Sequence, residues 1–181
     1  MKHRNFTHNL IVLIIITILK LIYKYSEMDD LHFLLEPTSK IVGFLNNSSS
    51  IFIKDAGYYH ESLNIIINKS CSGFNFLILC FAIHIFSIIP LLYTAQQRVY
   101  AFFILFLGSY FLTIVINSCR IVLIILLNKL LVAYGFSINW MHQAAGTFVY
   151  LFFLIVIYLT FNHLIARFAF IKSMKNDEKF A

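Results

Sequence analysis

The chain has 181 residues, of which 60% are hydrophobic and 17% are aromatic, and its mean hydropathy is positive. One soluble core of this length could not bury so much apolar surface, so the composition excludes an ordinary soluble domain and indicates an integral membrane protein. The formal charge of +6 does not predict a nucleic-acid partner, because the basic residues flank apolar segments and gather in a Lys-rich tail. That arrangement is typical of topology signals and of contact with anionic membrane lipid.

Apolar segments long enough to cross a membrane recur along the chain. A crossing helix needs about 20 mostly apolar residues, and four segments meet that need, at roughly 8–25, 73–93, 99–117 and 143–163. The first has a basic start but no small-residue cleavage site after it, so we expect an uncleaved anchor. A shorter apolar run, 121–134, is interrupted by Asn128 and Lys129, which favours a re-entrant or interfacial helix. We predict an all-α integral membrane protein that forms a single membrane domain over residues 1–181.

Residues 26–70 form the one sizeable region expected outside the membrane, and they hold most of the carboxylates. The stretch LHFLLEPTSKIVGFLN has apolar residues at helical spacing, broken by Pro37. The stretch SIFIKDAGYYHESLNIIIN indicates two extended runs around an Asp-Ala-Gly turn. We expect a short amphipathic helix and then a hairpin that leads into Cys71. Lys and Arg are denser on the side of the chain termini, which predicts both termini in the cytoplasm and this small segment outside.

Polar groups beside the apolar segments are the functional candidates, because such groups are costly at membrane depth. No Asp or Glu lies inside an apolar segment, which argues against a paired-aspartate protease, a carboxylate proton relay and an HExxH metalloprotease. The cysteines form no CxxC and no zinc spacing, so we predict neither a metal site nor a cofactor. Cys80 and His84 lie four residues apart and are expected to pack, not to bind a metal. In the predicted topology, Cys71, Arg120 and His142 all lie at the outer ends of spans.

A thiol, a guanidinium and an imidazole at one membrane face suit acyl transfer. The thiolate attacks the acyl carbon and is stabilised by an imidazolium and by a helix N-terminus. The imidazole can donate a proton to the leaving amine, and the guanidinium can hold the charge that develops on the carbonyl oxygen. Asn117 shares a helix face with Arg120, where it could orient the guanidinium or bind the substrate backbone. Ser72 and Gly73 are expected to form a small open turn, and Gly73 and Gly146 leave room for close backbone approach.

Each candidate residue also has a plainer interpretation. Cys71 could be an inert thiol, or it could pair with Cys119 in a disulfide on the outer side. Arg120 could snorkel to the lipid headgroups, as an Arg at a helix end often does. His142 could belong to an interfacial aromatic belt.

Three short motifs occur in a defined order: CSG at 71–73, NSCR at 117–120 and HQAAG at 142–146. Together they resemble the exosortase/archaeosortase family, whose members carry a Cys in a C-S/A-G context, then N-x-x-R, then H-x-x-x-G. The resemblance covers about residues 60–160. Because one anchor precedes the Cys, the chain is similar to the compact branch of that family, such as the enzymes called exosortase K.

The resemblance implies a membrane cysteine transpeptidase or protease in which Cys71 is the nucleophile, Arg120 stabilises the intermediate and His142 is the third member. The supporting motif positions match Asn117, Gly73 and Gly146. The implied substrates are exported proteins with a C-terminal signal made of a short recognition motif, a transmembrane helix and a basic cluster. The implied location is the cytoplasmic membrane, with the site facing outward.

The residues leave two other classes of function open. One is a membrane thiol oxidoreductase that uses Cys71 and Cys119, both predicted at the outer face, although the chain lacks a CxxC motif. The other is a non-enzymatic membrane subunit, which the near absence of charge inside the apolar segments permits. Only the transpeptidase gives Arg120 and His142 a necessary part.

Overall fold

The computed structural model describes the backbone at residues 2–92, 94–133 and 139–177, and the side chains at 9–92, 94–131 and 144–167. The chain is mostly helical, and its α-helices are α1 (Lys2–Tyr25), α2 (His32–Asn46), α3 (Phe74–Ile88), α4 (Ala95–Ala133) and α5 (Asn139–Asp177). Three short strands lie between α2 and α3: β1 (Ser50–Ile53), β2 (Gly57–His60) and β3 (Ile65–Ile67). Single 3-10 turns are η1 (Asp29–Leu31), η2 (Glu61–Leu63), η3 (Lys69–Cys71) and η4 (Ile89–Leu91).

Long apolar helices indicate a membrane protein. Within the described residues, three segments are long and apolar enough to cross a bilayer, namely Lys69–Leu91, Ala95–Leu131 and Ala144–Arg167. Large hydrophobic side chains such as Phe103 and Leu159 stay exposed on them, as expected of surfaces that lipid covers. The predicted first span lies in α1, which packs along α3 but is not one of the three segments. A crossing by α1 therefore stays a prediction.

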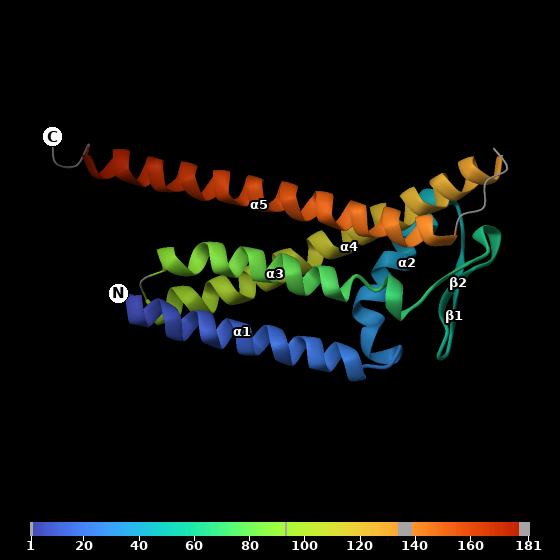
Figure 1. Ribbon diagram of the computed structural model, residues 1–181, viewed down its shortest axis with the longest axis horizontal. Coiled ribbons are helices and arrows are strands. Elements are labelled where there is room, and N and C mark those ends of the chain that lie inside the picture. Colours follow the sequence, from blue (N-terminus) through green and yellow to red (C-terminus); the bar gives the residue numbers. More distant parts are fainter. Residues whose placement is uncertain (1, 93, 134–138, 178–181) are drawn as a thin grey trace.

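The long helices run side by side, and the sheet lies at one end of them (Figure 1). α1 begins and α5 ends at the opposite end of the molecule (Figure 1). The main hydrophobic core lies near the sheet, where α2, α3, α4 and the strands meet around Leu35, Leu77 and Ile121. This arrangement agrees with the prediction that the two termini share one side, and it puts the region 26–70 at the other end.

The mostly helical chain is compatible with the predicted all-α membrane protein, and it also contains a small antiparallel sheet. The expected hairpin exists: β1 pairs with β2, and Ile53 lies opposite Gly57. Gly57 has φ +116, and a side chain there would run into the Ile67 carbonyl oxygen on β3, so only glycine fits. The expected second extended run is broken, because Asn64 adopts the left-handed backbone conformation with φ 51 after η2. The chain then returns as β3, a third strand that the sequence did not predict.

Residues 121–133 do not form the separate helix that was predicted, and residue 134 lies outside the described residues. The re-entrant or interfacial placement of this stretch stays a prediction. α4 is one continuous helix of 39 residues, about 58 Å long at 1.5 Å per residue. That length exceeds the roughly 30 Å hydrocarbon core. The run contains no Gly or Pro that would break a helix, and Asn128 and Lys129 are simply exposed on its surface.

Pro37 lies inside α2 and does not break it, contrary to the prediction. A proline lacks the N–H that would bond to the carbonyl one turn earlier, which here belongs to Phe33. Tyr110 of α4 donates its hydroxyl to that Phe33 carbonyl at 2.7 Å. Because the Tyr110 hydroxyl replaces the N–H that Pro37 lacks, α2 continues through Pro37. The same hydrogen bond fixes α2 against α4.

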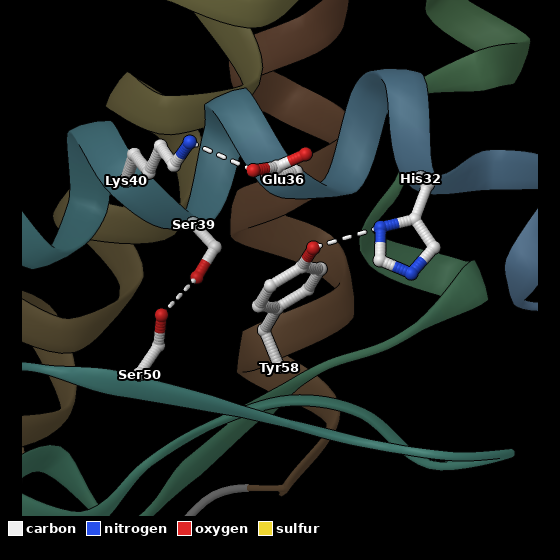
Figure 2. A network of polar contacts seen from close by, with 6 residues as sticks. All are labelled: His32, Glu36, Ser39, Lys40, Ser50 and Tyr58. Carbon is white, nitrogen blue, oxygen red and sulfur yellow. Dashed lines mark hydrogen bonds and ion pairs between the residues drawn. The ribbon is translucent and has the colours of Figure 1, made fainter.

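Polar side chains fasten α2 to the sheet (Figure 2). The Tyr58 hydroxyl on β2 lies 2.8 Å from Nδ1 of His32, and Ser39 donates to the Ser50 hydroxyl on β1 at 3.0 Å. His60 of β2 is fully buried and contacts the hydroxyl of Ser39. These bonds satisfy polar groups that the helix and the sheet enclose between them, so the outer segment packs as one layered unit.

Burial also makes the stability of this unit depend on pH. His60 touches the hydroxyls of Ser39 (Nε2 to Oγ, 2.9 Å) and Ser48 (Nδ1 to Oγ, 3.2 Å), and burial lowers the pKa of His60 from its ordinary 6.5. Because the folded state favours the neutral ring, the stability that His60 contributes is present above pH 6.5 and is lost as the pH falls below it. We expect the hydrogen-exchange protection factors of β2 amides to drop between about pH 7.5 and about pH 5.5. His60→Gln, which does not titrate, should remove that dependence; equal protection of the unchanged chain at both values would contradict the account.

Candidate functional site

Cys71 lies at the end of η3, a single 3-10 turn between β3 and α3. The side chain of Asn68 caps this turn by accepting a hydrogen bond from the backbone N–H of Ser70 at 3.1 Å. The thiol of Cys71 is free and half-buried, and its Sγ lies 3.9 Å from the Ser70 hydroxyl. Local hydrogen bonds therefore fix the turn while the sulfur stays accessible.

Ser72 and Gly73 connect this turn to α3. Gly73 has φ +74, the left-handed region that favours glycine, and a Cβ there would come within 3.1 Å of Asn117 and Thr113 on α4. Ser72 was expected in an open turn, but it is fully buried and accepts a hydrogen bond from the Phe74 N–H at 3.3 Å. These two residues thus let α3 begin directly against α4.

Asn117 of α4 joins three parts of the chain. Its side chain is fully buried, and its Nδ2 donates to the backbone carbonyl of Cys71 at 2.6 Å. Its Oδ1 accepts a hydrogen bond from the hydroxyl of Tyr150 on α5. Nη1 of Arg120 lies 3.5 Å from the same oxygen. One amide therefore ties the backbone that carries the thiol to both long helices.

The guanidinium of Arg120 is held against α5. Its Nη1 donates to the Tyr150 hydroxyl at 3.1 Å, and its Cζ lies 4.7 Å from the centroid of the Tyr150 ring, a cation–π contact. Its Nε is buried and has no hydrogen-bond partner within the described part of the chain. A Cβ at Gly146 would lie 2.6 Å from that Nε, so the guanidinium fits only because residue 146 is glycine. The positive charge is thereby fixed in one orientation.

Cys71 and Arg120 line one narrow cavity of about 80 Å³. Its other walls come from β3 and from α4, through Ile65, Ile66, Ile67, Ile121, Ile124, Ile125 and Asn128. A cation among apolar walls interacts more strongly with a negative charge than it would in water. The cavity is therefore suited to stabilise an oxyanion that forms beside the sulfur.

His142 lies in the first turns of α5, but its side chain lies outside the described residues. Positions 142, 146 and 150 follow one another at four-residue spacing, which aligns them along one face of a helix. Gly146 and Tyr150 of that row both contact Arg120. The site thus gathers Cys71, Asn117, Arg120, Gly73 and Gly146, while for His142 only the position along α5 is known.

The remaining candidate groups lie elsewhere. Cys119 is exposed on α4 and does not line the cavity of Cys71. Cys80 and His84 are buried within the bundle, where Nδ1 of His84 lies 3.0 Å from the Ser109 hydroxyl. Within the side chains that the structure describes, no three His, Cys, Asp or Glu residues gather as metal ligands.

Two contacts of the site were missed by sequence reasoning. Tyr150 was not a candidate, although its place four residues after Gly146 is a signal that could have found it. Tyr23 of α1 was also missed: its hydroxyl donates to the Lys69 carbonyl at 3.1 Å, and Lys69 Nζ donates to the Ser26 carbonyl at 2.6 Å. The end of α1 is thereby fastened to the turn that carries the thiol.

The fold and the site together define a helical membrane protein with a half-buried thiol beside a fixed guanidinium. Comparison of the chain with protein-family models, with curated proteins and with solved structures gives no match.

Gly146→Ala should destabilise the protein, because the added methyl group meets the guanidinium of Arg120. Overpacking of this kind costs about 1–3 kcal/mol, so we expect a lower Tm in detergent. Gly108→Ala is the matched control: it lies on α4 with nothing within 4 Å of a built Cβ, and Ala is the better helix former by about 1 kcal/mol. Its Tm should stay the same or rise. Equal losses in both variants would contradict the close contact at Gly146.

Tyr150→Phe should remove the hydroxyl that donates to Asn117 and accepts from Arg120. A buried acceptor that loses its donor costs about 1–3 kcal/mol, which an unfolding titration in mixed micelles would measure. Tyr158→Phe, at an exposed position of α5, provides the control and should change little. If the two variants unfold alike, the hydroxyl of Tyr150 does not hold the site together.

Proposed function

We propose that the chain is a membrane cysteine transpeptidase or protease of the exosortase/archaeosortase type. In this proposal Cys71 is the nucleophile, Arg120 stabilises the oxyanion and His142 transfers the proton. The observation that carries it is that Cys71 and Arg120 line the same cavity. The amide of Asn117 fixes the backbone of Cys71 in place there by donating to the Cys71 carbonyl.

The first chemical step forms a thioester. His142 takes the proton of the Cys71 thiol, and the thiolate attacks the carbonyl carbon of the substrate peptide bond. Negative charge moves to the carbonyl oxygen, where the guanidinium of Arg120 stabilises it without losing its own proton. The C–N bond then breaks, and the leaving amine takes the proton back from His142.

The second step restores the thiol. Water, or a hydroxyl or amine of an acceptor, attacks the thioester carbonyl and passes its proton through His142 to the departing sulfur. Water gives a free carboxylic acid, whereas an acceptor gives an ester or an amide. Both outcomes use the same acyl-enzyme and the same three side chains.

The proposed substrates are exported proteins that end in a short recognition motif, a transmembrane helix and a basic cluster, processed at the outer face of the cytoplasmic membrane. The position of the thiol supports this class, because Cys71 lies a few residues before the apolar helix α3. At that level a neighbouring substrate helix would also leave the hydrocarbon region, so its flanking peptide would be within reach of the sulfur.

The two alternative functions receive no such support. A thiol oxidoreductase would need Cys71 and Cys119 to meet, but Cys119 is exposed away from the cavity. A non-enzymatic subunit would give no reason for Arg120 to be held beside a half-buried thiol. The transpeptidase uses both features.

Co-expression with a reporter tests the proposal. The reporter carries a C-terminal motif, transmembrane helix and basic tail from a candidate substrate of the same cells, and a gel shift follows the loss of its tail. Cys71→Ala and His142→Ala should abolish the shift, and Arg120→Ala should slow it by at least about 100-fold, the effect of losing an oxyanion donor. Cys119→Ser is the matched thiol control and should process normally. Processing that survives Cys71→Ala, or that fails in Cys119→Ser, would contradict the proposal.

A further inference from the structure

β3 is an edge strand of the three-stranded sheet. The strand order is β1-β2-β3, and β3 pairs with β2 through Ile65, Ile66 and Ile67. This pairing uses one edge of β3. The other edge faces no strand among the described residues, so its backbone N–H and C=O groups are not part of the sheet ladder.

The cavity of Cys71 runs along that open edge. Successive side chains of a strand point to opposite faces, so a cavity on one face would touch Ile66 alone or only Ile65 and Ile67. All three residues line this cavity, which means that it follows the backbone of β3. Because β2 covers the paired edge, the cavity lies along the unpaired one, between β3 and the isoleucines of α4.

An open strand edge is a template for an extended peptide. It presents N–H and C=O groups that pair with a new strand, and peptides are commonly bound in this way. Here the edge ends four residues before Cys71, which lines the same cavity together with Arg120. A peptide paired with β3 would therefore run directly to the sulfur and the guanidinium.

We propose that the substrate binds as an additional β-strand along the open edge of β3, so that main-chain pairing brings its scissile carbonyl to Cys71. This inference rests on the proposed function and specifies its substrate as an extended segment without tertiary structure next to the cleaved bond. The walls of the cavity are mostly isoleucine side chains, which favours an aliphatic side chain of the substrate beside the scissile bond.

The test uses the purified full-length chain in detergent and measures alkylation of Cys71 by mass spectrometry. Iodoacetamide reports the basal reactivity of the thiol, and vinyl sulfones on one to four alanine residues report binding of the peptide. Lengthening the peptide should raise the rate of labelling about 10-fold or more. N-methylation should remove that gain only at alternate residues, because a paired strand turns successive N–H groups to opposite edges.

Variants of the two edge strands give a second measurement. The N–H groups of Ile65 and Ile66 point to opposite edges, so one of Ile65→Pro and Ile66→Pro removes an open-edge donor and keeps the pairing with β2. That variant should lose the effect of peptide length on the rate of labelling. The control is a proline on the edge strand β1, which does not line the cavity. Because Ile51 and Ile66 both lie opposite Tyr59, the control that keeps its pairing with β2 is Phe52→Pro for Ile66→Pro and Ile51→Pro for Ile65→Pro, and it should keep the effect.

The outcomes separate this inference from the proposed function. Strand pairing is overturned if the rate of labelling does not depend on peptide length. It is also overturned if N-methylation has no effect or has the same effect at every residue. Either result leaves the role of Cys71 intact. Reporter processing that survives Cys71→Ala overturns the proposed function itself. A Cys71 that neither reagent alkylates overturns both.

Discussion

The buried amide of Asn117 is the contact on which the site depends. It donates to the carbonyl of Cys71 on one side and accepts from the hydroxyl of Tyr150 on the other, so the turn before α3 and the helix α5 are both fixed to α4. An unpaired amide inside an apolar bundle would cost about 1–3 kcal/mol, which favours the one arrangement that pairs it. Two glycines leave the space that this arrangement needs. Gly73 lies beside Asn117, and Gly146 lies beside Arg120.

The outer unit completes the site from the other direction. Tyr110 replaces the donor that Pro37 lacks and so fixes α2 across α4, and the bonds between α2 and the sheet hold the strands over the end of the bundle. β3 then leads straight into the turn of Cys71. A thiol in a short turn is thus held by a bundle on one side and a sheet on the other, and the cavity is the space left between them.

The sequence predicted the apolar helices, the hairpin and the spacing of Asn117 and Arg120, because each follows from a local repeat or turn. It could not predict the continuity of α4, since Asn128 and Lys129 are equally compatible with a long helix and with a short interfacial one. Three isoleucines in a row fit a strand or a helix alike, so β3 needed its partner β2 to be recognised. Tyr150 is one of many aromatic residues on apolar helices. Only its hydrogen bond to the buried Asn117 sets it apart, and that contact is not visible in the sequence.

The central claim is that Cys71 carries the substrate as a thioester, and trapping that intermediate tests it most directly. The reporter would be processed by the full-length chain, quenched in acid and digested, and each cysteine peptide would be analysed by mass spectrometry. The account predicts an adduct on Cys71 whose mass matches the new C-terminus of the reporter, and which hydroxylamine removes. An adduct on Cys119, or an unmodified Cys71 during continued turnover of the reporter, would contradict it.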